Sequence, residues 1–173
     1  MAGRILSVNL ARAAEPNVAS RGNGVTGINK RPVDEAELRP PGPKRGGLGG
    51  GLVGDVVSNR KFHGGDRQAV YAFAREELDG WEERLGRELP NGFFGENLTT
   101  AGLDVDGALI GERWSVGPDA VLEVTCGRTP CATFAKRMGE RAWVRRFTEV
   151  GRPGAYLAAV SYTHLTLPTN REV

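Results

Sequence analysis

Cys131 is the residue of this sequence with the most distinctive chemistry. It closes the run Arg128-Thr129-Pro130-Cys131, which follows an expected strand and precedes a helical pattern. A thiol at the start of a helix, with an arginine close in sequence, is expected to have a lowered pKa and to be rich in thiolate, the form that binds metals. The alternative interpretation is a buried structural cysteine, which is the commoner fate of a single cysteine.

A second candidate is His63, which is followed by Gly64 and Gly65. Two glycines leave the backbone amides open to a ligand beside the imidazole ring. Taken alone, the pattern is typical of a turn as often as of a site.

Two further runs carry polar groups suited to binding. Lys30 and Arg31 supply adjacent cations after a short β-prone segment, which suits a phosphate, although an exposed basic turn has the same pattern. Asn97 follows Glu96 and two aromatic residues, so this pair either orients a heterocyclic ligand or caps a turn.

Charge is unevenly distributed along the chain. Residues 21–67 hold nine Lys/Arg against five Asp/Glu, residues 68–125 hold four against twelve, and residues 126–152 hold seven against two. If the two basic segments converge, they form an anion-binding pocket. A net charge of only +2 is poor support for binding to a nucleic-acid polymer, and we expect none.

Length and composition predict one domain with a single core. No apolar run approaches the roughly 20 residues that cross a bilayer, and the N-terminus has no export signal, so we expect a cytoplasmic protein without a membrane partner. The two cysteines, Cys126 and Cys131, would close a very short disulfide loop and lack partners for a zinc site.

The pattern of elements predicts a mainly β protein, a barrel of strands decorated by a few α-helices, rather than a doubly wound sheet. The strongest helix signal is an apolar stripe over residues 75–89. Two shorter helical patterns lie within 133–150, separated by Gly139. The main expected strands cover residues 3–10, 105–116, 121–125 and 155–159.

The ordered set of motifs resembles the MOSC domain, and within it the small, stand-alone, YiiM-like bacterial branch. The runs that carry the resemblance are T-G-I-N-K-R-P-V, K-F-H-G-G, A-V-Y-A-F-A-R-E-E-L-D-G-W-E, G-F-F-G-E-N-L-T-T, G-A-L-I-G-E-R-W and R-T-P-C. No single run is specific, but the set in this order is. The resemblance extends over residues 3–159 and implies a MOSC-type β-barrel.

The resemblance also implies a molybdenum cofactor (molybdopterin) with Cys131 as metal ligand and catalytic residue. By the same carry-over, the cofactor-binding residues are Thr26, Lys30, Arg31, His63, Asn97 and Arg128. The YiiM-like branch is associated with reduction of small N-hydroxylated compounds. No cysteine set for an iron–sulfur cluster and no dinucleotide-binding glycine motif is present, so a separate electron-donor reductase is expected as partner.

Two other interpretations remain open. The same thiolate would serve a non-catalytic module that carries the cofactor or a sulfur atom. Alternatively, Cys131 is merely packed inside a barrel.

The last fourteen residues, 160–173, resemble the translation of a sequencing adapter. We therefore expect residues 1–159 to form a MOSC-like domain that is incomplete at its C-terminus. The segment 160–173, including His164, is expected to be a non-native tail without a functional contribution.

Overall fold

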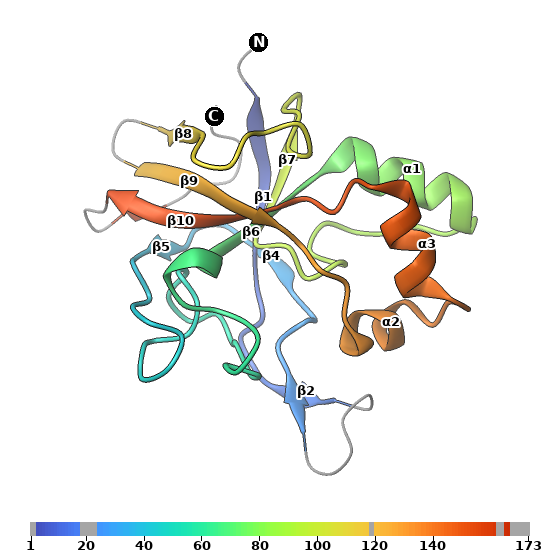
Figure 1. Cartoon of the computed structure of the whole chain (residues 1–173), viewed down its shortest axis with the longest axis horizontal. Coiled ribbons are helices and arrows are strands. Elements are labelled where there is room, and N and C mark those ends of the chain that lie inside the picture. Colours follow the sequence, from blue (N-terminus) through green and yellow to red (C-terminus); the bar gives the residue numbers. More distant parts are fainter. Residues whose placement is uncertain (1–2, 18–23, 118–119, 162–164, 167–173) are drawn as a thin grey trace.

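A sheet of seven strands is the centre of the computed structural model, which describes residues 3–17, 24–117, 120–161 and 165–166 (Figure 1). Its strand order is β4-β1-β7-β6-β10-β9-β8. The strands are β1 (Arg4–Leu10), β4 (Arg31–Val33), β6 (Val70–Ala74), β7 (Leu98–Ala101), β8 (Arg113–Val116), β9 (Ala120–Gly127) and β10 (Ala155–Ser161).

Neighbouring strands of this sheet pair antiparallel, except that β6 and β7 run parallel. Register shifts interrupt β1 and β10, and irregularities of this kind bend a strand and increase its twist. The sheet curls into a half-barrel with helices on one side (Figure 1). The predicted mainly β architecture is therefore confirmed.

Two small ladders accompany the main sheet. Strand β2 (Glu15–Pro16) pairs with β3 (Val25–Thr26) in an arm that projects from the half-barrel (Figure 1). Strand β5 (Glu37–Leu38) pairs with β11 (Leu165–Thr166).

The segment expected to be a non-native tail contributes to two of these strands. Strand β10 continues as far as Ser161, and Leu165 and Thr166 pair with Leu38 and Glu37. His164 lies outside the described residues. The division of the chain near residue 159 stays a prediction.

Strand β6 separates two apolar cores, because alternate residues of a strand point to opposite faces. Val70, Ala72 and Ala74 pack into the core inside the half-barrel. Tyr71 and Phe73 pack into an aromatic core on the helical side. All five side chains of β6 are buried, which explains why its sequence lacks a polar alternation.

Within the part of the chain that the structure describes, the α-helices are α1 (Arg75–Leu85), α2 (Ala132–Met138) and α3 (Trp143–Val150). The two short helical patterns are confirmed, with the left-handed Gly139 (φ 69°) ending α2. The helix predicted over 75–89 is shorter than expected because Gly86 (φ 63°) caps it. Leu89, past that cap, is nevertheless buried in the aromatic core.

The strand predicted over residues 105–116 is wrong for most of its length. Only Arg113–Val116 pairs as a strand, antiparallel to β9. Leu109 and Ile110 occupy a turn and are three-quarters exposed, so their apolar character does not report burial. The left-handed Gly111 (φ 90°) completes this turn.

Candidate functional site

Cys131 is the N-cap residue of α2, between the end of β9 and the first helical turn. Its extended backbone (φ −124°, ψ 170°) brings the chain into the helix, and its carbonyl accepts the Ala135 N–H at 2.9 Å. The thiol is half-buried and is not part of a disulfide. The position confirms the expected placement between a strand and a helix.

The surroundings of the Cys131 thiol favour thiolate. Burial raises its pKa, but three groups act in the other direction: a side-chain hydrogen bond from His63, a backbone hydrogen bond from Phe134, and the positive charge of Arg128. Together they lower the pKa from 9.0 to about 7. The thiolate is therefore substantially populated at neutral pH.

Arg128 is the cation whose charge acts on the thiol, and two aromatic rings and a backbone carbonyl contact its guanidinium. Its guanidinium lies over the Phe134 ring at 3.9 Å and the Tyr71 ring at 4.9 Å. Its Nη1 donates to the carbonyl of Phe94 at 2.5 Å. Burial lowers the pKa of Arg128, but Tyr71 and Cys131, among others, raise it by more. The pKa therefore lies above its ordinary value, and the charge is retained.

His63 lies on a loop that is distant from Cys131 in the sequence. This loop packs closely against the backbone of a neighbouring segment. Gly64 (φ 80°) and Gly65 (φ 78°) are both left-handed, and a Cβ on Gly64 would lie 2.6 Å from the Gly49 carbonyl oxygen. The His63 N–H is bonded to the carbonyl of Asn59 at 3.0 Å. The predicted His-Gly-Gly run thus presents an imidazole from a tightly packed backbone.

Lys30 and Asn97 meet at a carboxylate that the sequence did not single out, Asp55. Lys30 Nζ lies 2.5 Å from both oxygens of Asp55, and the two side chains are 8% and 2% exposed. Asn97 Nδ2 donates to Asp55 Oδ2 at 2.9 Å, and the Ala11 N–H donates to Oδ1 at 2.9 Å. Lys30 is therefore a buried, compensated cation rather than an exposed basic residue.

Asn97 also connects this cluster with the thiol. Its Oδ1 accepts the N–H of Tyr71 at 3.2 Å, and its own N–H donates to the Tyr71 carbonyl at 2.8 Å. The Tyr71 ring lies beside Arg128, which in turn acts on Cys131. Asn97 thus contributes to the shape of the site through strand β6.

Thr26 and Arg31 lie on or next to the β2–β3 arm, away from these contacts. The Thr26 hydroxyl accepts the N–H of Ile28 at 3.1 Å, and Arg31 is exposed at the start of β4. The arm reaches α2 through Asn29, whose Oδ1 accepts from Arg137 Nη2 at 3.0 Å. Burial lowers the pKa of Arg137, and the nearby charge of Arg31 among others lowers it further.

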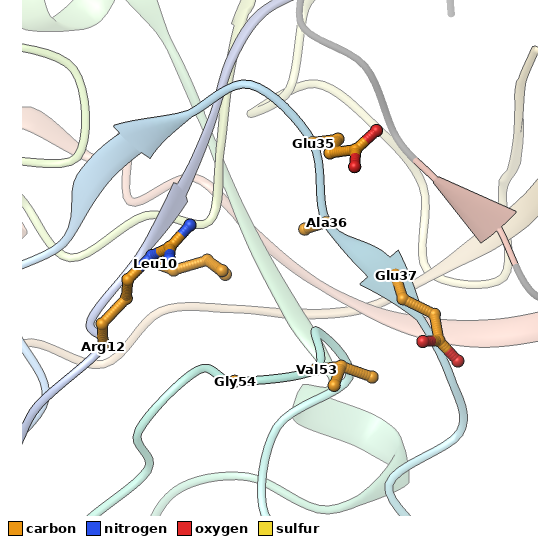
Figure 2. A pocket seen from close by; sticks show the side chains of 7 residues that line it. All are labelled: Leu10, Arg12, Glu35, Ala36, Glu37, Val53 and Gly54. Atoms are coloured by element: carbon orange, nitrogen blue, oxygen red, sulfur yellow. The ribbon is translucent and has the colours of Figure 1, made fainter.

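A cavity of about 520 Å³ lies elsewhere, between the end of β1 and β5. Figure 2 shows its lining residues: Leu10, Arg12, Glu35, Ala36, Glu37, Val53 and Gly54. None of the predicted site residues lines it, although Val53 and Gly54 lead directly into Asp55. Its volume therefore does not identify the place where the thiolate chemistry occurs.

Of the residues predicted for the site, the structure brings Cys131, Arg128 and His63 together, and their roles stay predictions. Sequence reasoning missed Asp55, a single acid in a glycine-rich loop, and Arg137, which is on the helix that Cys131 begins. The basic segment around Arg137 was the one signal for it. Within the described residues, no group of three or more His, Cys, Asp or Glu side chains could hold a metal ion.

A curled half-barrel with a thiolate at the start of a short helix defines the class of protein. The profile described as the MOSC domain matches residues 59–166, and the chain therefore belongs to the MOSC domain family. It is 34% identical over 148 residues to the uncharacterized protein YflK of Bacillus subtilis, an alignment that covers 86% of this chain and 63% of YflK.

Two further similarities extend this finding. A protein named reductase, from Gibberella moniliformis, is 30% identical over 108 residues, which cover 60% of this chain and 19% of that protein. The crystal structure of YiiM from Geobacillus stearothermophilus has the same fold, with a TM-score of 0.71 at 24% identity over 99% of this chain and 74% of that chain. The chain spans less than two thirds of the length of YflK and of the Gibberella protein.

Proposed function

We propose that this protein binds the molybdenum cofactor and reduces small N-hydroxylated compounds with electrons from a separate reductase. The observation that carries the proposal is the Cys131 thiol, whose pKa is lowered to about 7 between His63 and Arg128. A half-exposed thiolate is the soft ligand that a molybdenum–dithiolene centre takes from a protein. Family membership and a relative named reductase support the same direction.

The residues present fit such a group. Cys131 would supply the protein ligand, and the cofactor itself would supply the remaining ligands, which agrees with the absence of a multi-residue metal cluster among the described residues. The backbone at Gly64 and Gly65 leaves no space for a Cβ because the backbone of Gly49 and Lys44 lies against it, and this packing holds the loop that carries His63. Arg31 would face the anionic end, with Thr26 nearby, whereas Lys30 is already paired with Asp55 and would support this part of the site from inside the protein.

The reaction determines what the protein must provide. Conversion of R–NHOH to R–NH₂ and water consumes two electrons and two protons, and the bound cofactor supplies the oxygen-accepting and electron-transferring chemistry. The chain would supply a thiolate ligand, an imidazole that lowers the pKa of this thiol, and a partly buried guanidinium that stabilises negative charge on it. Both cysteines are free, which suits a reducing compartment, and we place the reaction in the cytoplasm.

The test is the molybdenum and pterin content of protein produced in molybdate-supplied cells. Wild-type protein and Cys126→Ser should retain both, and Cys131→Ser should lose them while keeping its unfolding temperature. Molybdenum retained by Cys131→Ser would contradict the assignment. Turnover of a hydroxylamine-type substrate with an artificial electron donor then separates a reductase from a module that only carries the cofactor or sulfur.

A further inference from the structure

Glu96 carries a fully buried carboxyl group two residues before β7. Its Oε1 accepts the backbone N–H of Gly92 at 2.5 Å and the hydroxyl of Thr99 at 2.9 Å. Its Oε2 has no hydrogen-bond partner among the described residues. Burial raises the pKa of this carboxyl, which favours the neutral form inside the protein.

Glu96 binds a tight turn over residues 92–95 through the backbone N–H of Gly92. The Gly95 N–H donates to the Gly92 carbonyl at 2.9 Å, and both glycines are left-handed (φ 84° and 86°). A Cβ on Gly92 would lie 2.7 Å from the Lys30 carbonyl oxygen. Because Glu96 binds the first residue of the turn from behind, it fixes where the turn's carbonyls point.

Two consecutive carbonyls of this turn each accept from an arginine. The Phe94 oxygen accepts from Arg128 Nη1 at 2.5 Å, and the Phe93 oxygen accepts from Arg137 Nε at 3.4 Å. Arg128 precedes Cys131 in the chain, and Arg137 follows it near the end of α2. Both guanidinium groups are thus held by one turn, and Arg128 is the one whose charge acts on the thiol.

We propose that Glu96 is a positioning residue of this site. Its hydrogen bonds fix the 92–95 turn so that the Phe94 carbonyl holds Arg128 where the charge of this arginine acts on Cys131. One carboxyl oxygen makes both contacts, so a neutral glutamine, which keeps that oxygen, is expected to replace it. The inference rests on the proposed function only for the identity of the group that Cys131 binds.

The experiment measures the alkylation rate of Cys131 by iodoacetamide at pH 6 in metal-free, folded protein. Cys126 is followed by peptide mass spectrometry in the same sample as an internal reference. Glu96→Ala should slow alkylation of Cys131 about tenfold, the effect of raising a thiol pKa by about one unit, and leave Cys126 unchanged. Glu96→Gln should restore the Cys131 rate to within about twofold of wild type.

Glu88→Ala is the matched control, because Glu88 is an exposed glutamate shortly before the same turn. A folded Glu96→Ala protein with the wild-type Cys131 rate would overturn the proposal, and so would a Glu96→Gln protein as slow as Glu96→Ala. If Glu96→Ala does not fold, Thr99→Val replaces it, with about threefold slowing expected. An unchanged rate in that variant would count against the positioning role.

The measurement does not depend on molybdenum. A protein in which Glu96 controls Cys131 but which binds no molybdenum would leave the positioning role intact and refute the proposed function alone. A protein that binds molybdenum but shows no effect of Glu96 would refute the positioning role and leave the proposed function intact.

Discussion

The imidazole of His63 lies close enough to the thiol of Cys131 to lower its pKa, although one residue lies on a loop before β6 and the other at the start of α2. No spacing rule connects the two residues. The fold ties the loop of His63 to β9, because the hydroxyl of Thr125 on that strand donates to the carbonyl of Arg67, four residues after His63. The proximity of His63 to Cys131 contributes to the lowered pKa of this thiol, and so to the thiolate present at neutral pH.

Removal of the His63 side chain should raise the pKa of Cys131. His63 is one of the groups that lower this pKa, which lies at about 7, so His63→Ala moves the titration midpoint to higher pH and leaves less thiolate at pH 7. The rate of alkylation against pH, resolved for Cys131 by mass spectrometry, gives the midpoint. Phe62→Ala is the control, since Phe62 is the exposed neighbour of His63. An unshifted midpoint in His63→Ala would show that the contact does not govern the thiol.

Asp55→Asn should destabilise the protein by about 3 kcal/mol, because it leaves the buried ammonium of Lys30 without its counter-charge. Denaturant unfolding gives the free-energy change. Asp79→Asn is the control: Asp79 pairs with Arg75 on the surface of α1, where such a pair contributes about 0.5 kcal/mol. Equal effects of the two substitutions would mean that the Lys30–Asp55 pair is solvated.

The sequence predicted the parts of this site that are local in the chain. Cys131, Arg128 and the helix that follows were found together because a strand, a proline and a helical pattern stand in one short run. Asp55 gave no usable signal, because a single acid in a glycine-rich segment has the same pattern whether it is buried or exposed. Glu96 was noted as orienting a ligand or capping a turn, but its burial could not be predicted. Their role depends on partners from β1, β7 and distant loops.

The same distinction holds for the fold. Strands β1 and β9 and the helices on either side of Gly139 follow from periodicity and turn residues within each segment. Strand β7 was missed because Leu98–Ala101 is short and buried, and its parallel pairing with β6 is set by the sheet as a whole. The over-long strand at 105–116 arose because apolar Leu109 and Ile110 are exposed in a turn.

Arg31 and Lys30 should differ in how they affect cofactor retention. Arg31 is exposed, so Arg31→Ala should reduce the pterin content of purified protein without changing the free energy of unfolding. Lys30→Ala should lower both quantities, because it also leaves Asp55 as an uncompensated buried charge. Pterin fluorescence and denaturant unfolding measure the two effects. Normal pterin content in Arg31→Ala would show that Arg31 does not contribute to cofactor binding.

The glycines after His63 offer the sharpest test of how the loop is held. Gly64→Ala places a Cβ 2.6 Å from the Gly49 carbonyl oxygen at a φ of 80°, so it should cost about 1–3 kcal/mol and displace His63 from Cys131. The alkylation midpoint of Cys131 should therefore rise in Gly64→Ala even though no titratable group has been changed. Gly80→Ala is the control, because Gly80 lies within α1 with open space at its Cβ, and alanine there should stabilise by about 0.5–1 kcal/mol. If Gly64→Ala were as stable as wild type with an unchanged midpoint, the loop would be adaptable, and His63 would reach Cys131 without the support of the backbone around it.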